Sequence, residues 1–306
     1  MSSVAANRRG ILAMLAAMTL FTANDTLLKL ASDALAPGQI MAVRGLFASL
    51  FALGLVTAFG EWRRLPAIAS PLVLLRAGFE AATAFLYITA LAHLPLANIT
   101  ALLLASPILM TLLTVMLGME RVGPRRWAAI LAGFAGVLAI VRPSVEGFNL
   151  YAGLALASAF MVVGRDFTTR LIGGRVPSAV VTLSTTASVT AAGFALGLTE
   201  EWRAPDPPHL LLLAGAAALV TLGNLSIVLA FRQADIAVVS PFRYAVALLA
   251  LAAGYAVFGE VPDPLSTFGI ALIVGSGVYT IHRERLRARL EAARPLEAAV
   301  GRAEEP

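Results

Sequence analysis

The sequence predicts an all-α integral membrane protein with ten transmembrane helices, arranged as two inverted five-helix repeats. Apolar residues make up 59% of its 306 residues and charged residues only 13%, whereas an ordinary soluble domain has about 25% charged residues. Ten runs approach the roughly 20 mostly apolar residues that a membrane span needs. Two of these runs, 140 residues apart, end alike at Glu120 and Glu260, and each glutamate has a proline four residues on. Duplication at this scale predicts the architecture.

The ten spans follow one another with short gaps, so consecutive helices are expected to be antiparallel neighbours. In order, the predicted spans are residues 10–31, 38–58, 72–92, 96–117, 125–141, 148–168, 178–198, 210–231, 236–257 and 265–282. Prolines stand at or near the starts of seven of them, where a helix tolerates proline best. An alternative makes the first span a signal peptide, with Arg8 and Arg9 before its apolar region. The apolar run continues past Asp25 to Leu30, which favours a span.

Four regions are predicted along the chain. They are a cytoplasmic N-terminus at 1–9, the first five-helix repeat at 10–145, the second at 146–282, and a basic cytoplasmic tail at 283–306. Because five is odd, the second repeat enters the membrane from the opposite side, which places Glu120 inside and Glu260 outside. The pair Asp25 and Lys29 in the first span matches Asp166 and Arg170 in the sixth. Inverted repeats of this kind are the basis of alternating access in transporters.

Basic residues predict the orientation. With a cytoplasmic N-terminus, 17 basic residues fall in inside regions and 3 in outside regions. This positive-inside bias predicts a multi-pass protein of the cell inner membrane with both termini in the cytoplasm. The net charge of +5 and the pI near 10.2 reflect these loops and do not indicate a nucleic-acid partner.

The chain resembles the EamA-like branch of the drug/metabolite transporter superfamily over residues 10–282. The resemblance is carried by ten spans in two halves, by the glutamate endings of the fourth and ninth spans, and by shorter motifs. These motifs are Asn24-Asp25 with Lys29, Arg44-Gly45, Arg76, Ser240-Pro241-Phe242-Arg243-Tyr244 and Phe258-Gly259-Glu260-Val261-Pro262. Membership implies a carrier of small organic solutes, among which amino acids, nucleosides, S-adenosylmethionine and drugs are known.

Charged residues inside the spans are the main candidates for the site, because a charge at a helix centre costs about 2.5–3.5 kcal/mol on insertion scales. Their depths predict an Asp25–Arg44 contact on the outer side and a deeper Glu80–Arg243 contact that joins the two halves. The alternative is that both are packing pairs. Lys29 and Arg76 are expected to extend to the interface. These six residues sum to +2, which favours an anionic or zwitterionic solute.

Further candidates are polar or aromatic. Asn24, Asn98, Asn224 and Tyr244 are predicted to bind substrate, and the alternative for them is helix packing and helix–helix hydrogen bonding. Ser106-Pro107 and Ser240-Pro241 predict helix irregularities, since a proline leaves a backbone carbonyl unpaired. No cofactor and no metal site are predicted, because the chain has no cysteine and its three histidines lie far apart in sequence.

The predicted function is secondary active transport of a small organic metabolite: amino-acid-like, nucleoside-like or drug-like. No phosphate-binding loop is present, so a gradient or exchange must drive it, with a proton or a counter-solute as the second partner. The alternatives are an integral-membrane lipid-modifying enzyme, which would need a catalytic cluster, and an ion channel. The substrate, the direction of transport, and the choice between monomer and homodimer stay open at this stage.

Overall fold

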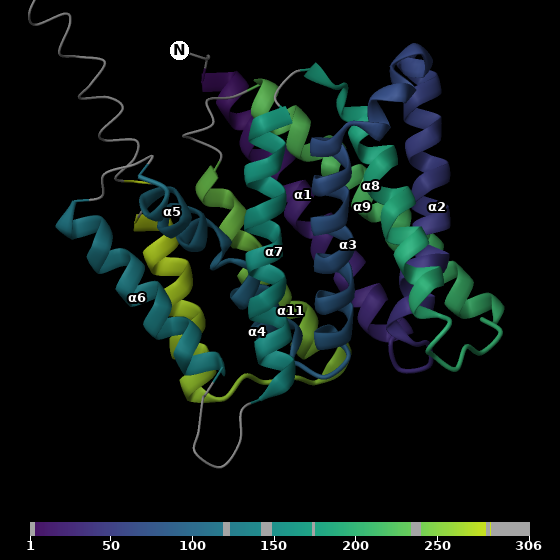
Figure 1. Ribbon diagram of the computed structural model, residues 1–306. Coiled ribbons are helices and arrows are strands. Elements are labelled where there is room, and N and C mark those ends of the chain that lie inside the picture. The colour runs from purple at the N-terminus through teal and green to yellow at the C-terminus, as the bar shows by residue number, and fades with distance from the viewer. Residues whose placement is uncertain are drawn as a thin grey trace, which may run out of the picture.

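The computed structural model describes residues 4–118, 123–141, 149–172, 175–233, 240–279 and 282, and their regular structure is helical throughout (Figure 1). The helices are α1 (Val4–Ala31), α2 (Pro37–Ala58), the 3-10 helix η1 (Glu61–Ala69), α3 (Pro71–Leu91), α4 (Leu96–Leu103), α5 (Ser106–Met116), α6 (Pro124–Val141), α7 (Leu150–Ile172), α8 (Ser178–Leu196), α9 (Pro207–Gln233), the 3-10 helix η3 (Ser240–Tyr244) and α11 (Ala245–Phe258). A last apolar helix runs over Pro264–Tyr279.

Among these described residues, six helices are long and apolar enough to cross a membrane, and four shorter apolar helices accompany them. The six lie in α1, α2, α3, α7, α8 and α9. Their positions match six of the predicted spans, so the all-helical, multi-pass prediction is confirmed. The count of ten spans and the inversion of the repeats stay predictions. Glu120 lies outside the described residues.

Both predicted helix irregularities are present. The fourth predicted span is broken between α4 and α5, where Leu104 and Ala105 form a turn and Pro107 lies in the first turn of α5. A proline is tolerated there because the backbone N–H it lacks would have no helical partner. Ser240 and Pro241 begin the 3-10 helix that precedes α11. The continuous spans predicted over 96–117 and 236–257 are therefore wrong in detail.

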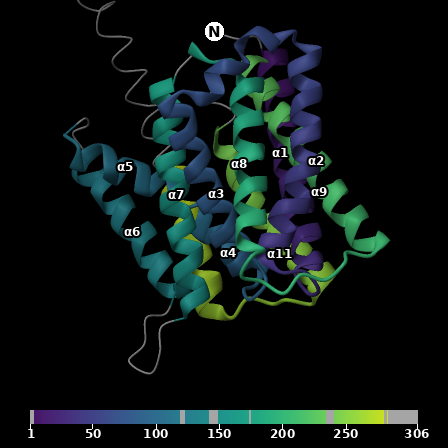
Figure 2. The ribbon, with the colours of Figure 1, turned by 45° about the vertical axis from the view of Figure 1, so that its right-hand side comes forward.

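The principal helix contacts cross between the two predicted halves. Helix α1 packs on α9, α2 on α8, α3 on α7 and α4 on α11 (Figures 1 and 2). Helix α6 meets the last helix so closely that a Cβ added to Gly136 would lie 2.7 Å from the carbonyl oxygen of Gly269. In the predicted repeat, α1 corresponds to α7 and α3 to α9, so the α1–α9 contact and the α3–α7 contact are equivalent. The interior of the protein is therefore a boundary between halves.

The largest apolar core lies toward the end of the bundle where α1 ends and α2 and α4 begin. Its fully buried members include Leu28, Ile40, Leu91, Leu96 and Leu102. This end is the predicted external end. Two smaller described clusters lie elsewhere, around Met14 and around Leu109.

Candidate functional site

Asp25 stands at the centre of a polar cluster between α1 and α3. Its Oδ1 accepts a hydrogen bond of 2.8 Å from the Nδ2 of Asn24, and its Oδ2 accepts one of 2.8 Å from the hydroxyl of Tyr87. Asn24 and Tyr87 are both buried. The Oδ1 of Asn24 is also buried, and it has no hydrogen-bond partner. The cluster therefore keeps an unused acceptor beside the carboxylate.

Arg44 of α2 lies near this cluster but forms no ion pair with Asp25. Its guanidinium is within electrostatic range of Asp25, Tyr87 and Glu80, but no ion pair joins it to Asp25 within 4.0 Å. The Nε of Arg44 is buried and has no hydrogen-bond partner. The predicted Asp25–Arg44 contact is thus wrong as a direct ion pair, because the Asp25 carboxylate is directed at Asn24 and Tyr87 instead. Arg44 keeps a free donor.

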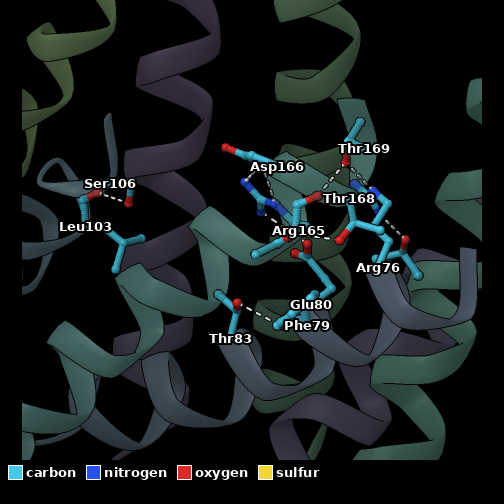
Figure 3. Close-up of polar contacts among 12 residues, drawn as sticks. Arg76, Phe79, Glu80, Thr83, Leu103, Ser106, Arg165, Asp166, Thr168 and Thr169 are labelled. Carbon is cyan, nitrogen blue, oxygen red and sulfur yellow. Dashed lines mark hydrogen bonds and ion pairs between the residues drawn. The ribbon is translucent and has the colours of Figure 1, made fainter. Parts of the chain in front are cut away.

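Glu80 of α3 pairs with Arg165 of α7, with 3.1 Å between Glu80 Oε2 and Arg165 Nη1 (Figure 3). Arg165 also binds its neighbour Asp166, at 2.9 Å from Oδ1. The predicted Glu80–Arg243 contact is wrong, since Arg243 is exposed. Its segment is a 3-10 helix, in which each residue turns about 120° rather than 100°, so an α-helical estimate misplaces its side chain. The Glu80 pair still joins the two predicted halves.

Arg76 of α3 forms hydrogen bonds with side chains of two neighbouring helices. Its Nε donates to the Thr169 hydroxyl of α7 at 2.9 Å, and its Nη1 donates to the Thr185 hydroxyl of α8 (Figure 3). It also interacts electrostatically with Glu80. Arg76 therefore belongs to the same cluster as Glu80 and Arg165.

Lys29, in the last turn of α1, is held by contacts to other segments. Its ammonium pairs with Glu260 Oε1, donates to the carbonyl of Leu94, and lies 5.1 Å from the centre of the Phe258 ring. The other oxygen of Glu260 accepts the N–H of Leu96 at 2.8 Å. Glu260, which ends the ninth predicted span, therefore also contacts two helices of the first predicted half.

The remaining predicted residues are dispersed. Asn98 is buried on α4; its Nδ2 lies 3.4 Å from the Ser266 hydroxyl, and its Oδ1 has no partner. Tyr244 is buried and packs against Gly277, where an added Cβ would collide with its hydroxyl. Asn224 is exposed on α9. The structure therefore gathers Asn24, Asp25, Arg44 and Glu80 and leaves the other four predicted residues elsewhere.

The sequence interpretation missed Arg165 as a site residue. It was counted with the cytoplasmic basic residues, whereas it lies within α7, about two turns before Ile172. A signal was present in the sequence, because the neighbouring Asp166 is the repeat counterpart of Asp25. Tyr87, whose hydroxyl donates to Asp25 in the structure, is a second residue outside the predicted site.

The formal charges of the polar cluster balance in the structure. Asp25 and Glu80 oppose Arg44 and Arg76, and Arg165 pairs with its neighbour Asp166, whose side chain is 46% exposed. The +2 sum expected from the sequence counted Lys29, which pairs with Glu260, and Arg243, which is exposed. Within the described part of the chain, no group of three or more His, Asp or Glu residues could hold a metal ion.

Comparison with known proteins identifies the family. Residues 8–142 match the EamA-like transporter family. A riboflavin transporter of Rhizobium johnstonii is 30% identical over 254 residues, covering 80% of this chain and 81% of that protein. A riboflavin transporter of Vibrio cholerae is 31% identical, covering 67% and 70%. An S-adenosylmethionine uptake transporter of Rickettsia bellii is 25% identical, covering 86% and 90%.

A solved crystal structure matches the fold with a TM-score of 0.63 at 21% sequence identity, over 91% of this chain and 98% of that one. At this identity the match concerns the fold alone. The relatives are named as transporters of small metabolites, and the described helices are apolar enough to cross a membrane several times. The chain therefore belongs to the EamA-like transporter family of the drug/metabolite transporter superfamily, and it is a multi-pass membrane transporter and not an enzyme.

Proposed function

We propose that the protein is a secondary active transporter that carries a small polar organic metabolite, neutral or zwitterionic, by alternating access between its two halves. One observation carries the proposal: the charge-balanced cluster around Asp25, Arg44 and Glu80 lies where the halves meet and leaves buried donors and acceptors without partners. A bound solute would supply those partners. Riboflavin is the first solute to test, because two relatives near 30% identity carry that name.

The balanced charge supports a neutral or zwitterionic solute over an anion. A net positive interior would attract an anion, and the described interior set has no net charge once Lys29 and Arg243 are removed from it. The free Nε of Arg44 offers a donor and the free Oδ1 of Asn24 an acceptor. Together they suit a group with both an acceptor and a donor, such as an amide, an imide or an amino-acid head group.

Asp25 is the better candidate for coupling to protons. No cation contacts its carboxylate, whereas Glu80 has Arg165 at ion-pair distance. Protonation of Glu80 would leave the Arg165 cation with Asp166 alone, but protonation of Asp25 would break no ion pair. Exchange against a counter-solute is the other driving force. We also propose that the protein lies in the inner membrane with both termini in the cytoplasm, because the arginines are concentrated in the predicted inside regions.

The test combines ligand binding with flux. Purified protein is screened by thermal shift against riboflavin, S-adenosylmethionine and neutral amino acids, since a ligand that binds only the folded state raises its stability. Any ligand that raises the Tm is then followed in proteoliposomes with and without a pH gradient. We expect saturable flux that Asp25→Asn reduces strongly and that Asp33→Asn, an exposed control beyond α1, leaves unchanged. Absence of both binding and flux across the panel would contradict the proposed function.

A further inference from the structure

The contact among Lys29, Glu260 and Leu96 joins three segments at one end of the bundle. Lys29 is in the last turn of α1, Leu96 is the first residue of α4, and Glu260 follows α11. One oxygen of Glu260 holds the Lys29 ammonium and the other accepts the Leu96 N–H at 2.8 Å. A single carboxylate from the second predicted half thus binds two helices of the first.

The chain after α11 is built to return Glu260 to this position. Gly259 takes a left-handed conformation with φ of 67°, which glycine adopts without strain. The N–H of Glu260 then donates to the carbonyl of Gly254 at 3.0 Å and closes the helix end. The reversal brings the Glu260 side chain back beside Gly254 of α11, where its carboxylate meets the start of α4. The Phe258-Gly259-Glu260 sequence therefore builds a contact between halves rather than only a helix end.

A second glutamate makes a similar contact at the same end. Glu200, in the loop between α8 and α9, accepts the N–H of Gly38 near the start of α2 at 3.0 Å. Gln39 exchanges hydrogen bonds with the backbone of Arg203 in the same loop. Carboxylates suit helix N-termini because the unpaired N–H groups carry partial positive charge. Loops of the second half thus hold helices of the first, next to the largest apolar core.

The contact is also connected to the polar cluster. Asp25 and Lys29 are four residues apart on α1, so they lie on one face of one helix. A shift of α1 that follows events at Asp25 would move Lys29 with it. Charges that water can reach rehydrate when they separate, so such an ion pair can open at a lower cost than a fully buried one. The Lys29 and Glu260 side chains retain 11% and 20% exposure.

We propose that the Lys29–Glu260–Leu96 contact is the gate that closes the transport pathway at the predicted external end, and that Lys29 and Glu260 are positioning residues for transport. The proposal rests on the proposed function, because a gate has meaning only in a carrier. In the structure the gate is closed. Transport requires Glu260 to leave Lys29 and Leu96 so that α1 and α4 separate from the end of α11.

Crosslinking tests the gate directly, because the chain contains no cysteine and every introduced thiol is unique. The double variant Lys29→Cys/Glu260→Cys is joined with a short bifunctional methanethiosulfonate in proteoliposomes, and flux is measured before and after reduction. Fixing a gate closed should lower flux at least about tenfold, with recovery on reduction. The single variants with reagent are controls. Asp206→Cys/His209→Cys, a contacting pair within one segment at this end, is the matched crosslinked control.

The outcomes separate the gate from the proposed function. Crosslinked protein that transports at the uncrosslinked rate would overturn the gate, whereas wild-type protein without flux of any solute would overturn the proposed function itself. If the cysteine pair does not reach the membrane, Lys29→Met and Lys29→Arg replace it. A gate predicts that Lys29→Met changes kcat at least about threefold with KM within about twofold, and that Lys29→Arg retains the wild-type kcat. Equal kcat in Lys29→Met and wild type would also overturn the gate.

Discussion

Two charged residues one turn apart on α1 are satisfied to very different extents. Lys29 binds a carboxylate and a backbone carbonyl and lies over an aromatic ring. Asp25 has a hydroxyl and an amide but no cation in contact, and beside it Asn24 Oδ1 and Arg44 Nε lack partners. An unsatisfied buried polar atom costs about 1–3 kcal/mol. The polar groups at the end of the bundle therefore satisfy one another. In the proposed function, the unpaired polar atoms of the interior receive their partners from a bound solute.

The largest effect on transport is expected from variants at Arg44. Arg44→Gln removes the free donor, and we expect flux to fall about a hundredfold, the loss of roughly 2.7 kcal/mol of interaction in transport. Folded protein should still be obtained, because Arg44 holds no direct ion pair. The measurement is flux in proteoliposomes at equal protein content. Asp33→Asn, the exposed control beyond α1, should keep the wild-type rate. Normal flux by Arg44→Gln would remove Arg44 from the site.

Removal of the Lys29 charge should lower the stability of the folded protein, whereas Arg44→Gln should mainly lower flux. Lys29→Met leaves Glu260 with one backbone donor and no cation, and we expect the free energy of unfolding to fall by about 2 kcal/mol, less than for a fully buried pair. Denaturation in detergent micelles measures this effect. Glu201→Gln, an exposed carboxylate at the same end, should change stability by less than about 0.5 kcal/mol. Equal stability of the Lys29 and Glu201 variants would mean that the end contact is not a structural tie.

The Glu80–Arg165 pair should have an intermediate effect. Each side chain is about a quarter exposed, at 26% and 24%, so solvent weakens the interaction. We expect Glu80→Gln and Arg165→Gln each to cost about 1–2 kcal/mol, and the double variant to cost less than the sum by about 1 kcal/mol. A double-mutant cycle on unfolding measures this coupling. Strict additivity would show that the two residues do not interact.

The smallest effect is expected at Asp206, which is exposed at the same end as Lys29. Hydrogen bonds from the backbone and side chain of His209 lower the pKa of the Asp206 carboxyl. A lowered pKa stabilises the folded state above the ordinary value of about 3.9, and this stabilisation is lost as the pH falls through the lowered pKa. Asp206→Asn should therefore flatten the stability profile slightly below about pH 4. An unchanged profile would show that the cap contributes nothing to acid sensitivity.

Composition and periodicity were sufficient to predict the helices, because a bilayer demands long apolar runs. The break before Ser106 and the 3-10 helix at Ser240 were also predictable, since each follows from a proline. The side-chain contacts between helices could not be predicted, because the angular position of a side chain depends on the local helix type. Arg243 shows this: it lies in a 3-10 segment and is exposed, although its position predicts a buried contact with Glu80.

The interior site was predicted in part for the same reason. Asp25, Asn24, Arg44 and Glu80 were found because charge and amide groups in a span need partners. Their actual partners, Tyr87 and Arg165, lie on other helices at positions that only the fold determines. The roles of Lys29 and Glu260 depended on the reversal at Gly259, which places a glutamate from a loop against a helix start far away in sequence.

A structure of the protein with its transported solute bound would show directly whether the unpaired interior atoms bind the solute. We expect the solute at the interior boundary between the halves, with a polar group on Arg44 Nε and Asn24 Oδ1 and within reach of Asp25. The partners that these buried atoms lack would then be supplied. A solute bound with full transport activity at another place, while Asn24 and Arg44 keep their unpaired atoms, would contradict the account.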